Sequence, residues 1–149
     1  MQAWLLVLHI VAVAAWLGTN IAQFVLFSHF RKDTGPARAA LHRAVAGFGR
    51  VLYIPAGTAV FVTGILLVLA SKDAFRFSDT FVVVGVLAIV IGAVLGSVFF
   101  APRGRRAAEL FEQRSSDAIN AENQIRTMGI FDTAIVLVAI IAMVQKWGI

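Results

Sequence analysis

Residues 8–30 read LHIVAVAAWLGTNIAQFVLFSHF, an apolar stretch that carries His9, Asn20 and Gln23 within it. The stretch is long enough to cross a bilayer, because a spanning helix needs about 20 apolar residues. Inside hydrocarbon, each polar side chain is costly unless a partner satisfies it. The stretch therefore predicts a transmembrane helix whose polar side chains meet partners inside a bundle.

The composition of the whole chain supports a membrane protein. Of the 149 residues, 60% are hydrophobic and 14% are charged, whereas soluble domains are about 45–50% apolar and about 25% charged. Apolar runs that could span a bilayer cover about 3–30, 50–70, 80–101 and 128–147. We expect an all-α, four-helix transmembrane bundle in which residues 1–149 form a single domain. The chain has no cysteine, which excludes disulfides and thiolate metal sites.

Basic residues are unevenly distributed among the connections. The 31–50 and 102–127 connections carry five each, whereas the 71–79 connection carries two. Because cytoplasmic connections are enriched in Lys and Arg, both termini are predicted on the outer, periplasmic or extracellular, side. This placement also accounts for the net charge of +5 without a nucleic-acid partner. Both long connections should be partly helical, since Pro36 follows a glycine and RRAAELFEQR (105–114) is amphipathic.

A single face of the first predicted span carries its polar groups. At about 100° per residue, His9, Trp16, Asn20, Gln23 and Phe27 fall close to one line. This face should point into the bundle. Asn20 and Gln23 are then expected either to hold helices together by hydrogen bonds or to line a polar path.

His9 is the one residue of this face that could ligate a cofactor. An imidazole can ligate a metal or a haem iron or accept a proton, although a lone histidine can also be a hydrogen-bonded core residue. Met143 of the fourth span lies at a similar depth, and a His–Met pair is a known haem ligation and a soft ligand set for copper(I). Trp16, two turns from His9, completes the candidate cofactor-binding set.

Other residues of the spans suggest structural roles. Gly85, Gly92 and Gly96 give the third span a small-residue face for close helix packing, within one subunit or in a homodimer. Pro55 should bend the second span. Arg50 and Asp132 begin the second and fourth spans at a similar depth and are predicted to form a structural ion pair. A proton-relay role for Asp132 is the alternative.

Three stretches resemble bacterial membrane families: LHIVAVAAWLG (8–18), GRVLYIPAGTAVFVTGILL (49–67) and FDTAIVLVAIIAMVQKWG (131–148). They are similar to HemJ-type protoporphyrinogen oxidases and, in the first stretch, to CopD-type copper-resistance domains. Small uncharacterised four-helix integral membrane proteins resemble the chain more closely. The resemblance implies a multi-pass protein of the bacterial inner (plasma) membrane. It also implies haem b, with copper less favoured, and His9 as a ligand. The third span lacks the lysine and the histidine of HemJ-type proteins.

Three function classes remain open. The first is a haem- or metal-binding protein that handles a redox reaction or a cofactor through His9. The second is a non-catalytic accessory or assembly subunit of a membrane complex. The third is a small channel or transporter whose polar path runs along His9, Asn20 and Gln23. No P-loop, HExxH or Ser–His–Asp pattern occurs, so the sequence does not decide whether the protein is an enzyme. The expected partners are the lipid bilayer, a second copy and another membrane subunit.

Overall fold

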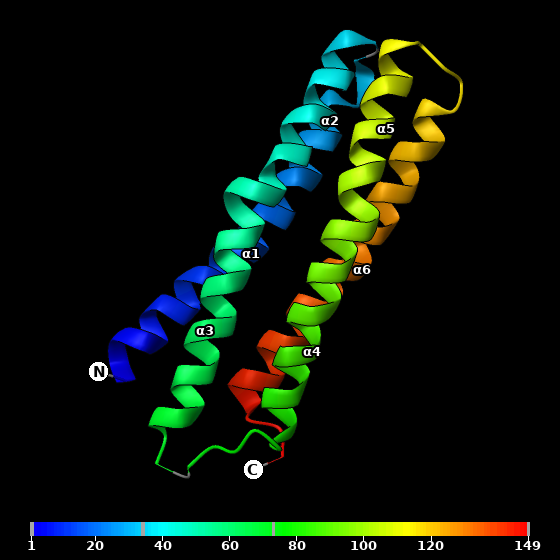
Figure 1. Ribbon diagram of the computed structural model, residues 1–149. Helices are drawn as coiled ribbons and strands as arrows, with labels where there is room; N and C mark the ends of the chain where they lie inside the picture. The colour runs from blue at the N-terminus through cyan, green and yellow to red at the C-terminus, as the bar shows by residue number, and fades with distance from the viewer. Residues whose placement is uncertain (1, 34, 73, 149) are drawn as a thin grey trace.

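The computed structural model describes residues 2–33, 35–72 and 74–148, and within these ranges the chain is built from helices. The predicted all-α bundle is confirmed: four long helices run alternately up and down (Figure 1). The elements are α1 (Gln2–His29), η1 (Phe30–Lys32), α2 (Pro36–Phe48), η2 (Gly49–Tyr53), α3 (Ile54–Ala70), α4 (Thr80–Val94), η3 (Leu95–Phe100), α5 (Ala101–Glu112) and α6 (Ala118–Gln145). The elements α2–η2–α3 form one continuous helix, and so do α4–η3–α5.

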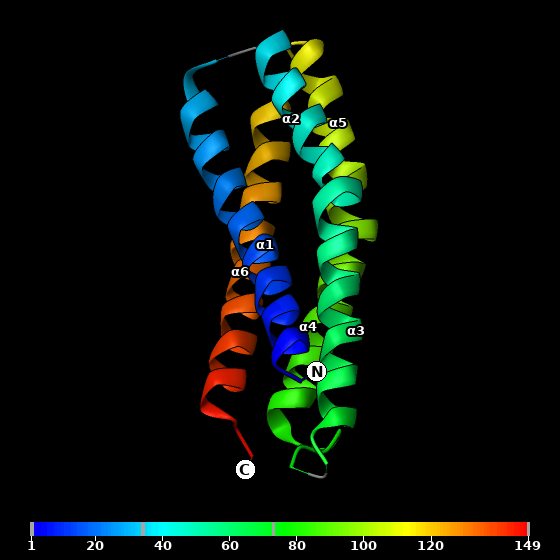
Figure 2. The same ribbon diagram turned by 90° about the vertical axis from the view of Figure 1, so that its left-hand side faces the viewer.

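Within the described residues, four helices are long and apolar enough to cross a membrane. By helix composition the chain is therefore a multi-pass membrane protein. Large apolar side chains cover its outside; Val98 is 68% and Val144 76% exposed, as expected where lipid replaces water. The chain ends lie toward the end of the bundle that carries the α3–α4 connection (Figures 1 and 2). The side of the membrane on which they lie remains a prediction.

The long helices extend beyond the predicted apolar runs. The helix Pro36–Ala70 has 35 residues, or about 52 Å at about 1.5 Å per residue, whereas the hydrocarbon core is about 30 Å thick. The extra turns belong to the 31–50 and 102–127 connections, which together form what we call the basic end. As predicted, α2 begins at Pro36 and the 105–112 stretch is an amphipathic helix, with Phe111 buried and Arg105 exposed.

A widened turn precedes a proline in each of the two continuous helices. The N–H of Ile54 bonds to the carbonyl of Gly49, and the N–H of Ala101 bonds to the carbonyl of Gly96, five residues back in each case. Pro55 and Pro102 follow directly. A proline lacks an N–H and crowds the carbonyl four residues back, and the π-helical turn relieves this conflict. A π-helical turn thus precedes Pro55 in an unbroken helix, and the bend expected there stays a prediction.

The packing of the bundle differs between its two halves. At the basic end α2 lies along α5. In the rest of the bundle, which we call the apolar half, α1 lies along α3 and α4 lies along α6 (Figures 1 and 2). The Trp16 ring packs between α3 and α4: a Cβ on Gly57 would lie 3.2 Å from it, and one on Gly92 would lie 2.5 Å from it. Gly85 similarly receives Met143, while Gly96 faces open space. Two of the three glycines predicted to pack helices therefore receive side chains of the same chain.

Candidate functional site

The predicted inward face of α1 is buried. His9 and Trp16 are each 8% exposed, Asn20 is 6% and Phe27 is 5% exposed. Gln23 is half-buried. The helical period alone accounts for this shared face, because these positions recur at intervals of three, four and seven residues.

Asn20 connects three parts of the bundle. Its Nδ2 donates to Asp132 Oδ2 at 3.0 Å and to Thr133 Oγ1 at 3.1 Å, both on α6. The Tyr53 hydroxyl of η2 donates to Asn20 Oδ1. Gln23 Nε2 in turn donates to the Tyr53 hydroxyl at 2.6 Å. The donors are ordered from Gln23 toward Asp132, so the chain of bonds stabilises a carboxylate at its end.

Asp132 is buried in the apolar half, at 7% exposure. Its predicted partner, Arg50, is exposed, and none of the ion pairs among the described residues joins the two. In place of Arg50, Asn20 donates to the carboxylate. The Trp16 indole N–H interacts with it outside hydrogen-bond geometry and has no other partner. The described surroundings thus give this carboxylate neutral donors and no cation.

His9 is held by Thr63 of α3. The distance from His9 Nδ1 to Thr63 Oγ1 is 2.9 Å, and the Thr63 hydroxyl donates to the carbonyl of Ala59. Since that hydroxyl has a single proton, Nδ1 of a neutral His9 carries the hydrogen and donates it to Oγ1. The ring also interacts with the backbone of Val60. The neutral ring therefore presents the Nε2 lone pair.

The second predicted ligand, Met143, lies against Gly85 of α4. Among the described residues, the side-chain hydrogen bond of His9 goes to Thr63 of α3. Those residues also contain no group of three or more His, Asp or Glu side chains able to hold a metal ion. Of the two predicted ligands, His9 is thus the one whose side chain is oriented by a hydrogen bond among the described residues.

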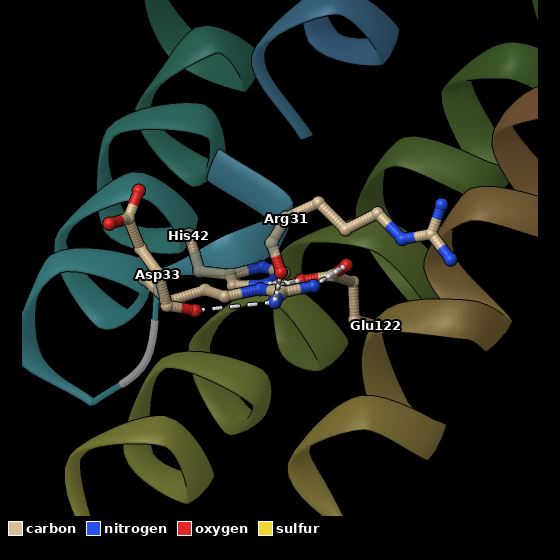
Figure 3. A network of polar contacts seen from close by, with 5 residues as sticks. Arg31, Asp33, His42 and Glu122 are labelled. Carbon is tan, nitrogen blue, oxygen red and sulfur yellow. Dashed lines mark hydrogen bonds and ion pairs between the residues drawn. The ribbon is translucent and has the colours of Figure 1, made fainter. Parts of the chain in front are cut away.

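A second buried network lies at the basic end (Figure 3). Two N–H groups of Arg38 on α2 donate hydrogen bonds to the carboxylate of Glu122 on α6, and Arg38 Nε lies 2.8 Å from Glu122 Oε2. His42 Nε2 lies 3.0 Å from the same Oε2. Arg38 also donates to the carbonyls of Arg31 and Asp33. The network therefore ties α2, α6 and the turn after α1 together.

Aromatic rings enclose the same network. The His42 ring lies between Phe27 and Phe111, with centroid distances of 5.1 and 5.3 Å. The Arg38 guanidinium lies 5.0 Å from the Phe111 ring centroid. The charged groups of the basic end are therefore partnered by charge-assisted hydrogen bonds and shielded from solvent.

The sequence prediction missed Arg38, His42, Glu122 and Tyr53. The first three lie in the charged connections, where most side chains face water, and only the spacing of Arg38 and His42, one helical turn apart, suggested a shared face. Tyr53 belongs to an apolar run, and its role depends on the π-helical turn that orients it. No pattern within that apolar run indicates that the Tyr53 hydroxyl donates a hydrogen bond to Asn20.

A scan against models of known protein families, a search of curated proteins and a search of solved structures each found no match.

Proposed function

We propose that this protein transfers protons across the membrane, with the Asp132 carboxylate as the group that binds and releases them. The observation that carries the proposal is the burial of this carboxylate in the apolar half of the bundle among neutral partners. Ionisable groups inside a membrane are rare, face the bundle interior and mark ion and proton pathways. The predicted structural ion pair with Arg50 would have removed this argument.

Both protonation states of Asp132 have support from their surroundings. The Asn20 amide favours the ionised form, because an N–H donor stabilises a negative charge. The apolar environment favours the protonated form, because an uncompensated charge in a medium of low dielectric is costly. Opposing preferences of this kind suit a group that must take up a proton and give it up again.

Polar groups extend from Asp132 toward both ends of the bundle. Tyr53 and Gln23 continue toward the basic end, and the tyrosine hydroxyl both donates and accepts. Trp16 and then His9 continue toward the other end, and the His9 Nε2 lone pair is a proton acceptor. From His9 to Gln23 the path covers about 21 Å of a hydrocarbon core about 30 Å thick. Water must link His9 to Asp132, because no hydrogen bond among the described residues joins the two, and it must also link the path to the two surfaces.

Proton flux into liposomes that carry the purified protein tests the proposal. With a pH-sensitive dye inside and an imposed membrane potential, the wild-type protein should acidify the lumen. Asp132→Asn should lower the flux to that of empty liposomes, since an amide takes up no proton in this pH range. Asp117→Asn is the matched control, because it makes the same change at an exposed position just before α6. Wild-type flux from Asp132→Asn would overturn the proposal.

We also propose a second function for the apolar half, the binding of haem b with His9 as a ligand of the iron. The supporting observation is the Thr63 hydroxyl, which fixes the tautomer that leaves Nε2 free. Ligating histidines are oriented in this way by a partner of their other nitrogen. His9 would hold the haem iron through Nε2, and the haem would supply one-electron chemistry.

The absorbance spectrum of the protein, purified after expression with a haem precursor, tests this function. A Soret band should be present and should disappear in His9→Ala. It should persist in His29→Ala, which removes an exposed imidazole from the same helix. A wild-type spectrum without a Soret band, or an unchanged band in His9→Ala, would remove this function and leave the proton-transfer proposal intact.

A further inference from the structure

A shallow groove of about 420 Å³ lies on the outside of the bundle, between η3 and the first half of α6. In Figure 1, α6 runs beside the α4–η3–α5 helix at this level. The groove therefore lies where the apolar half meets the basic end, close to the depth of lipid headgroups. Its lining residues are Phe99, Asn120, Asn123, Gln124, Thr127 and Met128.

The polar lining comes from one face of α6. Asn120, Asn123, Gln124 and Thr127 follow the spacing of neighbouring positions on a helix, and all four are exposed. None of these side chains takes part in a hydrogen bond within the described residues. Three carboxamides and one hydroxyl are therefore available to a ligand that offers both donors and acceptors.

A positively charged side chain, Arg103, lies beside one residue that lines the groove. The Arg103 guanidinium lies over the Phe99 ring, 3.9 Å from its centroid. Arg103 is exposed and belongs to none of the ion pairs among the described residues. A guanidinium held on an aromatic ring keeps its outer N–H groups free for a phosphate, which it can bind through two parallel bonds.

The same face of α6 continues into the apolar half as exposed hydrocarbon. Phe131 follows Thr127 by one turn and is 55% exposed, and Val138 lies two turns further along at 46% exposure. The face thus changes from carboxamides at the headgroup level to apolar side chains beside the hydrocarbon core. A ligand that matches this order has a polar, hydroxylated head and an acyl chain.

We propose that this groove binds an anionic phospholipid with a polyol headgroup of the phosphatidylglycerol type. The Arg103 guanidinium binds the phosphodiester. The carboxamides of Asn120, Asn123 and Gln124 form hydrogen bonds with the headgroup hydroxyls. One acyl chain packs along Phe131 and Val138. The charge of the basic end favours an anionic lipid over a zwitterionic one. The proposal is independent of proton transfer at Asp132, because the two sites share no residue.

Native mass spectrometry of the full chain in detergent, titrated with phosphatidylglycerol or phosphatidylcholine, tests the proposal. Phosphatidylglycerol should bind with a discrete first site. Arg103→Ala should raise the dissociation constant of that site about tenfold, as expected for the loss of about 1.4 kcal/mol of a charge-assisted contact. Asn123→Ala should also weaken it. Phosphatidylcholine should bind more weakly to the wild-type protein.

Arg105→Ala is the matched control, since it removes the same charge from an exposed position that does not line the groove. Its dissociation constant should stay at the wild-type value. Equal losses in Arg103→Ala and Arg105→Ala would show a diffuse basic surface and overturn the proposal. Equal affinities of the wild-type protein for the two lipids would also overturn it.

Discussion

Replacing Glu122 with glutamine should lower the free energy of unfolding by about 3–5 kcal/mol, the cost of removing one partner from a buried ion pair. Glu122 is 2% exposed and is shared by Arg38 and His42. Glutamine keeps the size of the side chain but leaves the Arg38 charge uncompensated in a buried site. Arg38 is itself only 7% exposed, so water cannot solvate it without opening the basic end.

The measurement is reversible unfolding in mixed micelles, followed by circular dichroism. Glu112→Gln is the matched control, because Glu112 pairs with Arg43 at the surface, where the two side chains are 46% and 54% exposed. A surface pair contributes about 0–1 kcal/mol, so this variant should stay close to the wild type. If the two variants lose the same small amount, the network of Figure 3 does not hold the basic end together.

Replacing Gly92 with alanine should destabilise the bundle by about 1–3 kcal/mol, as overpacking of a tight core does. The new methyl group would lie 2.5 Å from Trp16 Cζ2 and 2.8 Å from Cη2. The ring has little room to retreat, because a Cβ on Gly57 would lie 3.2 Å from its Cζ3 atom. The shift of Trp16 would also disturb its approach to Asp132.

Gly96→Ala is the control within the same small-residue motif. A Cβ at Gly96 would meet nothing within 4 Å, and alanine is about 0.5–1 kcal/mol better than glycine inside a helix. The two substitutions should therefore change stability in opposite directions in the same unfolding measurement. A stable Gly92→Ala variant would contradict the close packing of Trp16 on α4. A loss in Gly96→Ala would indicate a packing partner outside the chain.

The sequence predicted the elements well and the partners poorly. Apolar run length and helical period identify the four spans and place His9, Asn20 and Gln23 on one face, because both depend on residues of a single helix. No single apolar run shows how its helix is rotated about its own axis relative to the neighbouring helices. Their similar depth in the membrane therefore predicts an ion pair between Asp132 and Arg50, whereas in the structure Asn20 donates a hydrogen bond to Asp132.

The network at the basic end shows the same limit in another form. Arg38, His42 and Glu122 resemble the many solvated charges around them in the sequence. Their burial depends on α2 packing along α5 and on Phe27 and Phe111 closing over His42. Contacts between segments that are distant in the sequence decide which charges are buried.

Proton binding by Asp132 is the central claim, and infrared difference spectroscopy between acidic and alkaline pH measures it most directly. In the wild-type protein in lipid, the carbonyl stretch of a protonated carboxylic acid should disappear as the pH rises. One component of this signal should be missing from Asp132→Asn and present in Asp117→Asn. Identical difference spectra of the wild type and Asp132→Asn would contradict the account, because Asp132 would then keep one protonation state throughout.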